Sequence, residues 1–118
     1  MTDPQYPAGA AARTAVVMLP GSIDVSCAGR IGGELASVLT SGVTTVIADM
    51  TTTTFCDSSG ARVLVAACEQ AAASNIEVRL VVPSTFVWRA LALMGLDRLL
   101  PVYLTLDRAL AHGDHNRG

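Results

Sequence analysis

Short apolar runs that alternate with segments of helical periodicity constrain this fold more than any other feature of the sequence. Residues 15–19, 44–50 and 76–82 read as buried strands, and residues 102–104 as a shorter fourth. Residues 25–39, 58–73 and 85–94 carry apolar side chains at helical spacing, and residues 107–112 predict a last short helix. This alternation, with its short connections, predicts an α/β domain with a largely parallel sheet.

The composition indicates a single domain. The chain has 118 residues, of which 51% are hydrophobic and 15% charged, enough for one core without disulfides or structural metals. No apolar run reaches the roughly 18 residues of a membrane span, and the N-terminus lacks a signal-peptide pattern. We therefore expect a cytoplasmic protein without membrane partners. We expect a flexible arm over residues 1–13, a domain over 14–112 and a polar tail over 113–118.

Charge and cysteine content exclude several classes of function. The net charge is −2, and the eight basic residues are all arginines scattered along the chain, so no basic stripe indicates nucleic-acid binding. Without lysine, the chain has neither Schiff-base chemistry nor a P-loop lysine. Cys27, Cys56 and Cys68 lack metal-site spacing, and we interpret them as buried free thiols. A redox pair of Cys27 and Cys56 is the alternative.

The stretch FCDSSG, residues 55–60, carries the densest group of chemically useful side chains. It lies between a predicted strand and a predicted helix, where Asp57 is a good N-cap. A hydrolase nucleophile elbow needs G-x-S-x-G, and neither Ser58 nor Ser59 has those glycines. Taken alone, the stretch is best interpreted as a helix cap, and a serine that accepts a phosphate is the alternative.

The two histidines do not complete an enzyme site. His112 and His115 both lie near the C-terminus, so a serine nucleophile has no obvious base, and a metal site there would lack a rigid surround. We expect no catalysis, no metal and no cofactor. Residues 21–24 and 51–58 are better candidates for function, because both follow predicted strands of one parallel sheet and should lie side by side.

A strand, the motif GSID at residues 21–24, an amphipathic helix, a second strand and then DSSG together resemble STAS domains. Within them the chain is most similar to the small stand-alone anti-sigma-factor antagonists of bacteria, over residues 15–111. The resemblance implies a β/α superhelix, with a small mixed sheet of four to five strands and about four helices. The family usually begins with one more strand, and it often has an acidic residue where this chain has Ser22.

The resemblance also implies a mode of action. The phosphate acceptor is the first serine of DSSG, here Ser58, with Ser59 as the alternative. The partner is an anti-sigma factor that is also a serine kinase; the unphosphorylated antagonist binds it, and phosphorylation releases it and so regulates transcription. A metal-dependent serine phosphatase restores binding. The expected phosphosite environment and partner contacts are Ser22, Asp24, Thr54, Asp57, Ser59, Gly60 and Arg62.

Position supports phosphorylation of Ser58 independently of the resemblance. In the first turn of a helix, a phosphate should find free backbone N–H groups at the positive end of the helix dipole. The main alternative is a STAS adaptor subunit, not phosphorylated, in a signalling or lipid-transport assembly. A small α/β enzyme ranks third. We expect a monomer or weak dimer.

Overall fold

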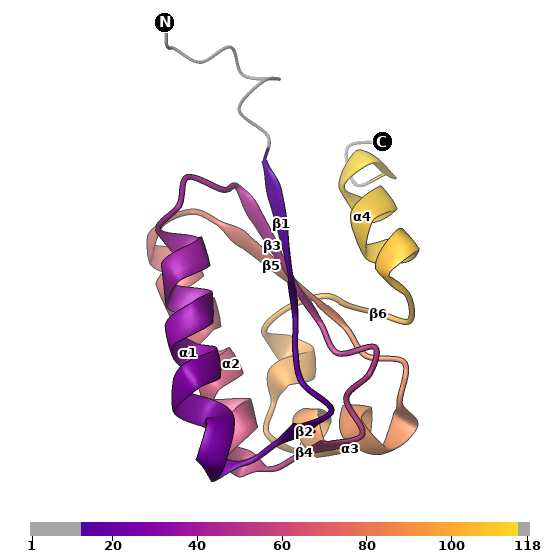
Figure 1. The fold of residues 1–118 in the computed structure, drawn as a ribbon. Coiled ribbons are helices and arrows are strands. Elements are labelled where there is room, and N and C mark those ends of the chain that lie inside the picture. Colours follow the sequence, from indigo (N-terminus) through magenta and orange to yellow (C-terminus); the bar gives the residue numbers. More distant parts are fainter. Residues whose placement is uncertain (1–12, 116–118) are drawn as a thin grey trace, which may run out of the picture.

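Four parallel strands form the main sheet, in the order β1-β3-β5-β6 (Figure 1). The computed structural model describes residues 13–115, and the side chains of residues 13–111. The strands are β1 (Thr14–Met18), β3 (Thr45–Asp49), β5 (Glu77–Val81) and β6 (Val102–Tyr103). The two inner strands are almost wholly buried, which explains why they read as continuous β-branched and aliphatic runs.

Helices cover both faces of this sheet (Figure 1). On one face lie α1 (Val25–Leu39) and α2 (Ser58–Ala73), which pack against each other; on the other lies α4 (Leu106–His115). Helix α3 (Thr85–Leu93) and the 3-10 turn η2 (Leu96–Arg98) follow β5, and both contribute buried side chains to the larger of the two hydrophobic cores. The helices predicted over residues 58–73 and 85–94 are observed, and Asn75 and Gly95, which lie just beyond them, adopt positive φ.

Alternate side chains of the strands feed two cores. Towards α1 and α2, a large cluster includes Val46, Ala48 and Leu80, together with Ile31 and Leu64 from the helices. On the opposite face a small cluster joins Ile47 and Val81 to Ala109 of α4. Because α4 packs over β5 and β6, the α4 side of the edge strand β1 stays exposed at Val16 and Met18.

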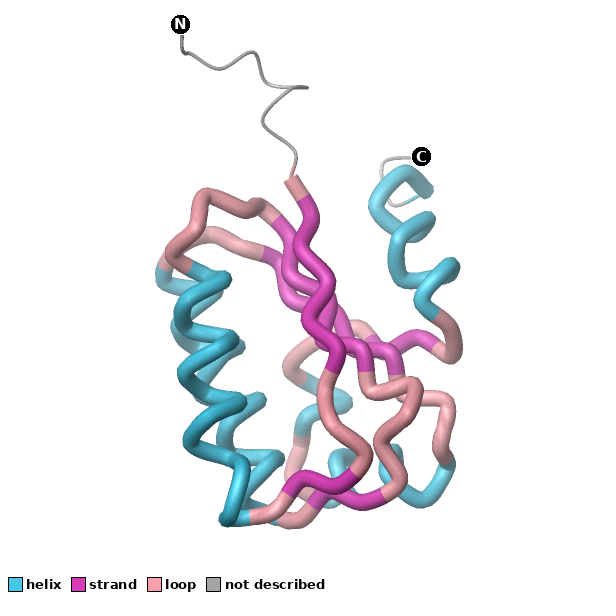
Figure 2. The backbone as a smooth tube through the Cα atoms, in the orientation of Figure 1, coloured by secondary structure: helices cyan, strands magenta, loops and turns pink. Residues whose placement is uncertain are grey.

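A second, two-stranded sheet pairs β2 (Ser22–Ile23) with β4 (Phe55–Cys56) in parallel. Figure 2 shows the pair as two short strands at one end of the molecule, joined to the main sheet through loops. We expected loops there, because two-residue strands carry no periodic signal. The expectation that residues 21–24 and 51–58 lie side by side is confirmed.

The predicted fold class is confirmed, with two corrections of detail. Every strand pair among residues 13–115 is parallel, so the part of the sheet that the structure describes is not mixed. The main-sheet strands are joined by helical crossovers, which return the chain in the same direction. Helix α4 begins at Leu106 and continues to His115, three residues into the expected tail. The expected arm lies outside the described residues except for Arg13.

Candidate functional site

Backbone hydrogen bonds hold the two candidate loops, residues 21–24 and 51–58, together in an arrangement that we call the clamp. Gly21 O accepts from Thr54 N at 2.7 Å, and Ile23 O accepts from Asp57 N at 3.1 Å. The loop that carries DSSG is held further by Thr53, whose buried hydroxyl donates to Pro20 O at 2.8 Å. The end of the molecule that bears both motifs is therefore ordered by hydrogen bonds between them.

An aspartate caps each of the two helices that leave this clamp. Asp24 Oδ1 accepts from Ser26 N at 2.9 Å and begins α1, while Asp57 Oδ1 accepts from Ser59 N at 2.8 Å and begins α2. The predicted N-cap at Asp57 is confirmed. Since β2 and β4 are parallel and each leads directly into a helix, the N-termini of α1 and α2 lie at the same end (Figure 1).

The carboxylate of Asp24 is stabilised in its charged form. Both the hydroxyl and the amide of Ser26 donate to it, and these bonds lower the pKa of Asp24 below its ordinary value. Ser26 was not among the predicted site residues. Its position two residues after an N-cap is the sequence signal that would have identified it.

Ser58 is the first residue of α2, and its side chain is exposed. Its hydroxyl makes no hydrogen bond to any residue that the structure describes. Ser59, the alternative acceptor, is half-buried, and its amide is committed to Asp57. The side chain of Ser58 is therefore the more accessible of the two.

Some of the backbone N–H groups that we expected to bind a phosphate on Ser58 already have a hydrogen-bond partner. Asp57 Oδ1 already accepts from the amides of Ser59 and Gly60, at 2.8 and 3.4 Å. The expectation of free N–H groups for a phosphate on Ser58 is therefore wrong for these two amides. The reason is that a good N-cap satisfies the donors that an anion would otherwise bind.

Gly60 lets α2 approach the clamp closely. A Cβ atom at this position would lie 2.6 Å from both Cys56 Sγ and Ile23 Cγ2. Residues Ile23 and Cys56 are register partners in the β2–β4 pair. The glycine of DSSG thus brings the first turn of α2 against the two short strands, and this contact positions Ser58.

The remaining predicted residues divide by location. Ser22 and Thr54 lie exposed in and beside the β2–β4 pair, and Thr54 Oγ1 donates to Gly21 O at 3.2 Å. Arg62 is exposed one turn after Ser58 on α2, and it makes no ion pair with a described residue. The clamp therefore brings together every predicted site residue except Arg62, which lies farther along the helix.

The cysteines near the site are free thiols. Cys56 is buried, and this burial, followed by the nearby Asp57 and Cys27, raises its pKa to about 11. Cys27 is half-buried and donates to Ser22 O at 3.5 Å. A thiol with so high a pKa forms little thiolate at neutral pH, which favours the interpretation of Cys56 as a small apolar core residue.

Two apolar side chains beside the site were not predicted to be functional. Phe55, three residues before Ser58, is 41% exposed, and Val25, at the start of α1, is 80% exposed. The alternation within β4, where Cys56 points inward, was the available signal for Phe55. Exposed apolar groups that lie together are typical of a protein-binding surface.

The described residues contain no group of three or more potential metal ligands. The side chains of His112 and His115 lie outside the described set. No helix in the described part is long and apolar enough to cross a membrane.

Comparisons with known proteins give one family. A family model described as the STAS domain matches residues 8–109. An anti-sigma factor antagonist from Mycobacterium paratuberculosis is 30% identical, with 82% of each chain covered and a TM-score of 0.69. The antagonist SpoIIAA in its unphosphorylated form is 23% identical over 87% of this chain and 90% of its own, with a TM-score of 0.74.

A further structural match comes from a different kind of protein. A sulfate transporter family protein from Wolinella succinogenes has a TM-score of 0.76 at 21% identity, with 96% of each chain covered. At that identity the likeness shows the fold alone. No curated protein sequence gives a significant match.

Proposed function

The chain belongs to the STAS domain family, and we propose that it is an anti-sigma-factor antagonist controlled by phosphorylation of Ser58. In this proposal the unphosphorylated protein binds an anti-sigma factor and so frees a sigma factor for transcription. Phosphorylation of Ser58 by that partner, acting as a serine kinase, releases the complex. A metal-dependent serine phosphatase reverses the modification.

The accessibility of Ser58 is the observation that carries the proposal. The serine is exposed at the first position of α2, and no described residue uses its hydroxyl. Its backbone is rigidly held, because Asp57 caps the helix and Gly60 packs against β2 and β4. A rigid backbone with a free hydroxyl suits a group that must be presented to a kinase.

The surface around Ser58 suits a protein partner. Phe55 and Val25 expose apolar area beside the serine, and the carboxylates of Asp24 and Asp57 flank it. An apolar centre with a polar rim is the usual anatomy of a binding interface. We assign the partner contact to this end of the molecule, with Ser22, Thr54 and Arg62 at its rim.

The charge of a phosphate is large enough to break such a contact. At neutral pH it adds about −1.5 to −2 charges. At about 5 Å from a partner carboxylate the repulsion is about 1 kcal/mol in water-like surroundings and about 5 kcal/mol at an effective dielectric of 20. Because 1.4 kcal/mol corresponds to a tenfold change in affinity, the modification would lower binding by roughly fivefold or more.

Relatives support a phosphorylation cycle of this kind. SpoIIAA, described as an anti-sigma factor antagonist, has been solved in an unphosphorylated and in a phosphorylated form, and both share the fold of this chain. We therefore propose that this chain is the substrate of a kinase rather than an enzyme. The action is that of a binding protein whose affinity is switched.

A STAS adaptor that is never phosphorylated is the competing function. Its support is the likeness in fold to a sulfate transporter family protein. That likeness does not distinguish the two functions, since one fold serves many. The adaptor predicts constitutive binding and no use of Ser58 by a kinase.

Intact-mass spectrometry after incubation with anti-sigma kinases and ATP tests the proposal. We expect one added phosphate on the wild type and on Ser59→Ala, and none on Ser58→Ala. The Ser59→Ala protein is the matched control, because it removes the neighbouring hydroxyl from the same helical turn. A phosphate retained on Ser58→Ala would refute the choice of serine. A wild-type protein that gains no phosphate in this incubation and still binds the partner tightly would favour the adaptor.

A further inference from the structure

A hollow of about 520 Å³ lies beside α4, at the carboxyl ends of the main-sheet strands. Met18 ends β1 and Asp49 ends β3; Leu104 follows β6, and Leu106 and Asp107 belong to the first turn of α4. In parallel sheets this edge is where ligands most often bind. The hollow shares no residue with the proposed Ser58 surface.

The hollow is acidic and contains one deeply buried carboxylate. Asp49 is only 2% exposed, and its Oδ1 accepts from the amide of Thr51 at 2.9 Å and from the Thr51 hydroxyl. Its other oxygen, Oδ2, receives no hydrogen bond from any residue that the structure describes. Oδ2 retains a small solvent-accessible area and Asp49 lines the hollow, so a ligand in the hollow can donate a hydrogen bond to this oxygen.

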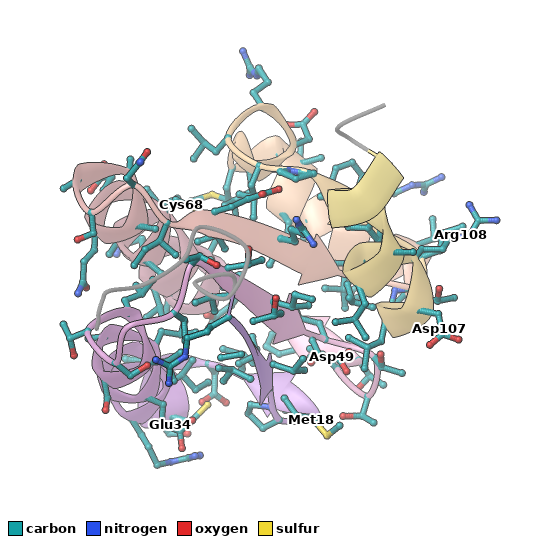
Figure 3. All side chains as sticks on the ribbon, turned by 90° about the horizontal axis from the view of Figure 1, so that it is seen from above. Met18, Glu34, Asp49, Cys68, Asp107 and Arg108 are labelled. Carbon is teal, nitrogen blue, oxygen red and sulfur yellow. The ribbon has the colours of Figure 1, made fainter. Side chains whose placement is uncertain are left out.

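No positive group within the hollow neutralises this charge. Asp107 adds a second carboxylate, and none of the described lining residues is basic. Figure 3 shows Asp49 and Asp107 on the same side of the molecule, on β3 and α4, while the Arg108 side chain extends outward from α4. The electrostatics of the hollow therefore favour a cation.

The walls are apolar and open to solvent. Met18 and Leu104 are 64% and 62% exposed, and Leu106 is half-buried beside them. Apolar walls above an acidic floor match a ligand that has a hydrocarbon stem and a cationic head, because the stem covers the walls while the head donates to the carboxylates. A bare metal ion would leave the apolar walls uncovered.

We propose that this hollow binds an organic cation, an ammonium or guanidinium group carried on a short apolar stem. The head group donates hydrogen bonds to Asp49 Oδ2 and pairs with Asp107, and the stem packs on Met18 and Leu104. This chemistry can come from a free small molecule or from an arginine side chain of another protein. The proposal is independent of Ser58 and its phosphorylation.

Amide chemical shifts of the full-length ¹⁵N-labelled protein test the inference. We expect n-butylguanidinium to shift the amides of Thr51, Leu104 and Leu106 in the millimolar range, and n-butanol, which has a similar stem and no charge, to shift them far less. Equal shifts with the two probes, or no shift with n-butylguanidinium, would overturn the proposal. The peptide acetyl-Gly-Arg-Gly-amide distinguishes the sources: tighter binding than n-butylguanidinium indicates a protein side chain, and weaker binding a free small molecule.

Two variants locate the cation. Asp49→Asn and Asp107→Asn should each weaken n-butylguanidinium binding by about fivefold or more, because each removes a charge-assisted hydrogen bond. Glu69→Gln removes the same charge from an exposed position on α2, across the sheet from α4, and should bind as the wild type does. Asp49 also accepts hydrogen bonds that hold the turn at Thr51. If Asp49→Asn does not fold, Asp107→Asn is the variant that decides the test. Unchanged affinity in Asp107→Asn would then refute the assignment.

Discussion

Replacing Gly60 with alanine should loosen the contact that positions Ser58. The new Cβ would lie 2.6 Å from Cys56 Sγ and 2.6 Å from Ile23 Cγ2, where ordinary van der Waals contact begins at 3.4 Å. The first turn of α2 and the β2–β4 pair would have to separate by roughly 1 Å. Both neighbours are buried and held by the strand pairing, so neither can turn away cheaply.

The size of the effect follows from two opposing terms. Overpacking a buried site costs about 1–3 kcal/mol. Replacing glycine by alanine inside a helix contributes up to about 1 kcal/mol in the opposite direction. We therefore expect Gly60→Ala to lower the free energy of unfolding by about 1–2 kcal/mol. Phosphorylation of Ser58 should also become slower, because the serine moves with the first turn.

Gly33→Ala is the matched control. Gly33 lies exposed inside α1, and a Cβ there would meet nothing within 4 Å, so this variant should gain about 0.5–1 kcal/mol in stability. Urea unfolding followed by circular dichroism measures both variants under the same conditions. If Gly60→Ala is as stable as Gly33→Ala, the close packing of α2 on the strand pair is not what requires glycine, and the reasoning fails.

Three further predictions concern groups whose environment differs from solvent. Because the pKa of Asp24 is lowered, its contribution to stability is present above the ordinary value of 3.8 and is lost as the pH falls through the lowered folded value. In urea unfolding at several pH values, Asp24→Asn should therefore reduce the loss of unfolding free energy that the wild type shows at acid pH. The same acid loss in both proteins would contradict this. Arg79 is buried and donates hydrogen bonds to Glu77 and to a carbonyl of α4. Arg79→Leu should therefore lower the free energy of unfolding by about 2–3 kcal/mol in the same assay. A variant as stable as the wild type would show that these bonds make no net contribution. The pKa values of Cys56 and Cys68 are both raised to about 11, chiefly by burial. Iodoacetamide at neutral pH should therefore label both thiols much more slowly in the native protein than in urea. Rapid labelling of either cysteine in the native protein, located by peptide mass mapping, would contradict this.

The sequence was sufficient for the main elements because their signals are periodic. The β-branched run at residues 44–50 and the apolar stripe of α2 each specify one type of structure over several residues. Positive φ at Asn75 and Gly95 was likewise readable from residue type. Such local preferences agree with the packing that the structure shows, so the predicted fold class was correct.

Features that depend on tertiary contact were not readable. The β2–β4 pair exists because Gly21 and Ile23 accept bonds from a loop that lies more than thirty residues away along the chain. The extension of α4 to His115 also follows from packing rather than from local pattern. Helix boundaries in particular depend on such contacts.

At the site, residue identity was more readable than residue environment. Asp57 and Ser58 follow from motif and capping, whereas the occupation of the Ser59 and Gly60 amides by Asp57 required the coordinates. The exposure of Phe55 and the burial of the Asp49 carboxylate are likewise properties of packing. The chemistry of the site was therefore predicted better than its hydrogen bonds.

The most direct test of the proposed switch is the affinity of the purified partner anti-sigma factor for this chain before and after stoichiometric phosphorylation, measured by isothermal titration calorimetry. We predict tight binding for the unphosphorylated protein and at least about fivefold weaker binding for the form that carries phosphate on Ser58. Equal affinities for the two forms would contradict the account, because an exposed phosphate at the centre of the interface could not then be what releases the partner.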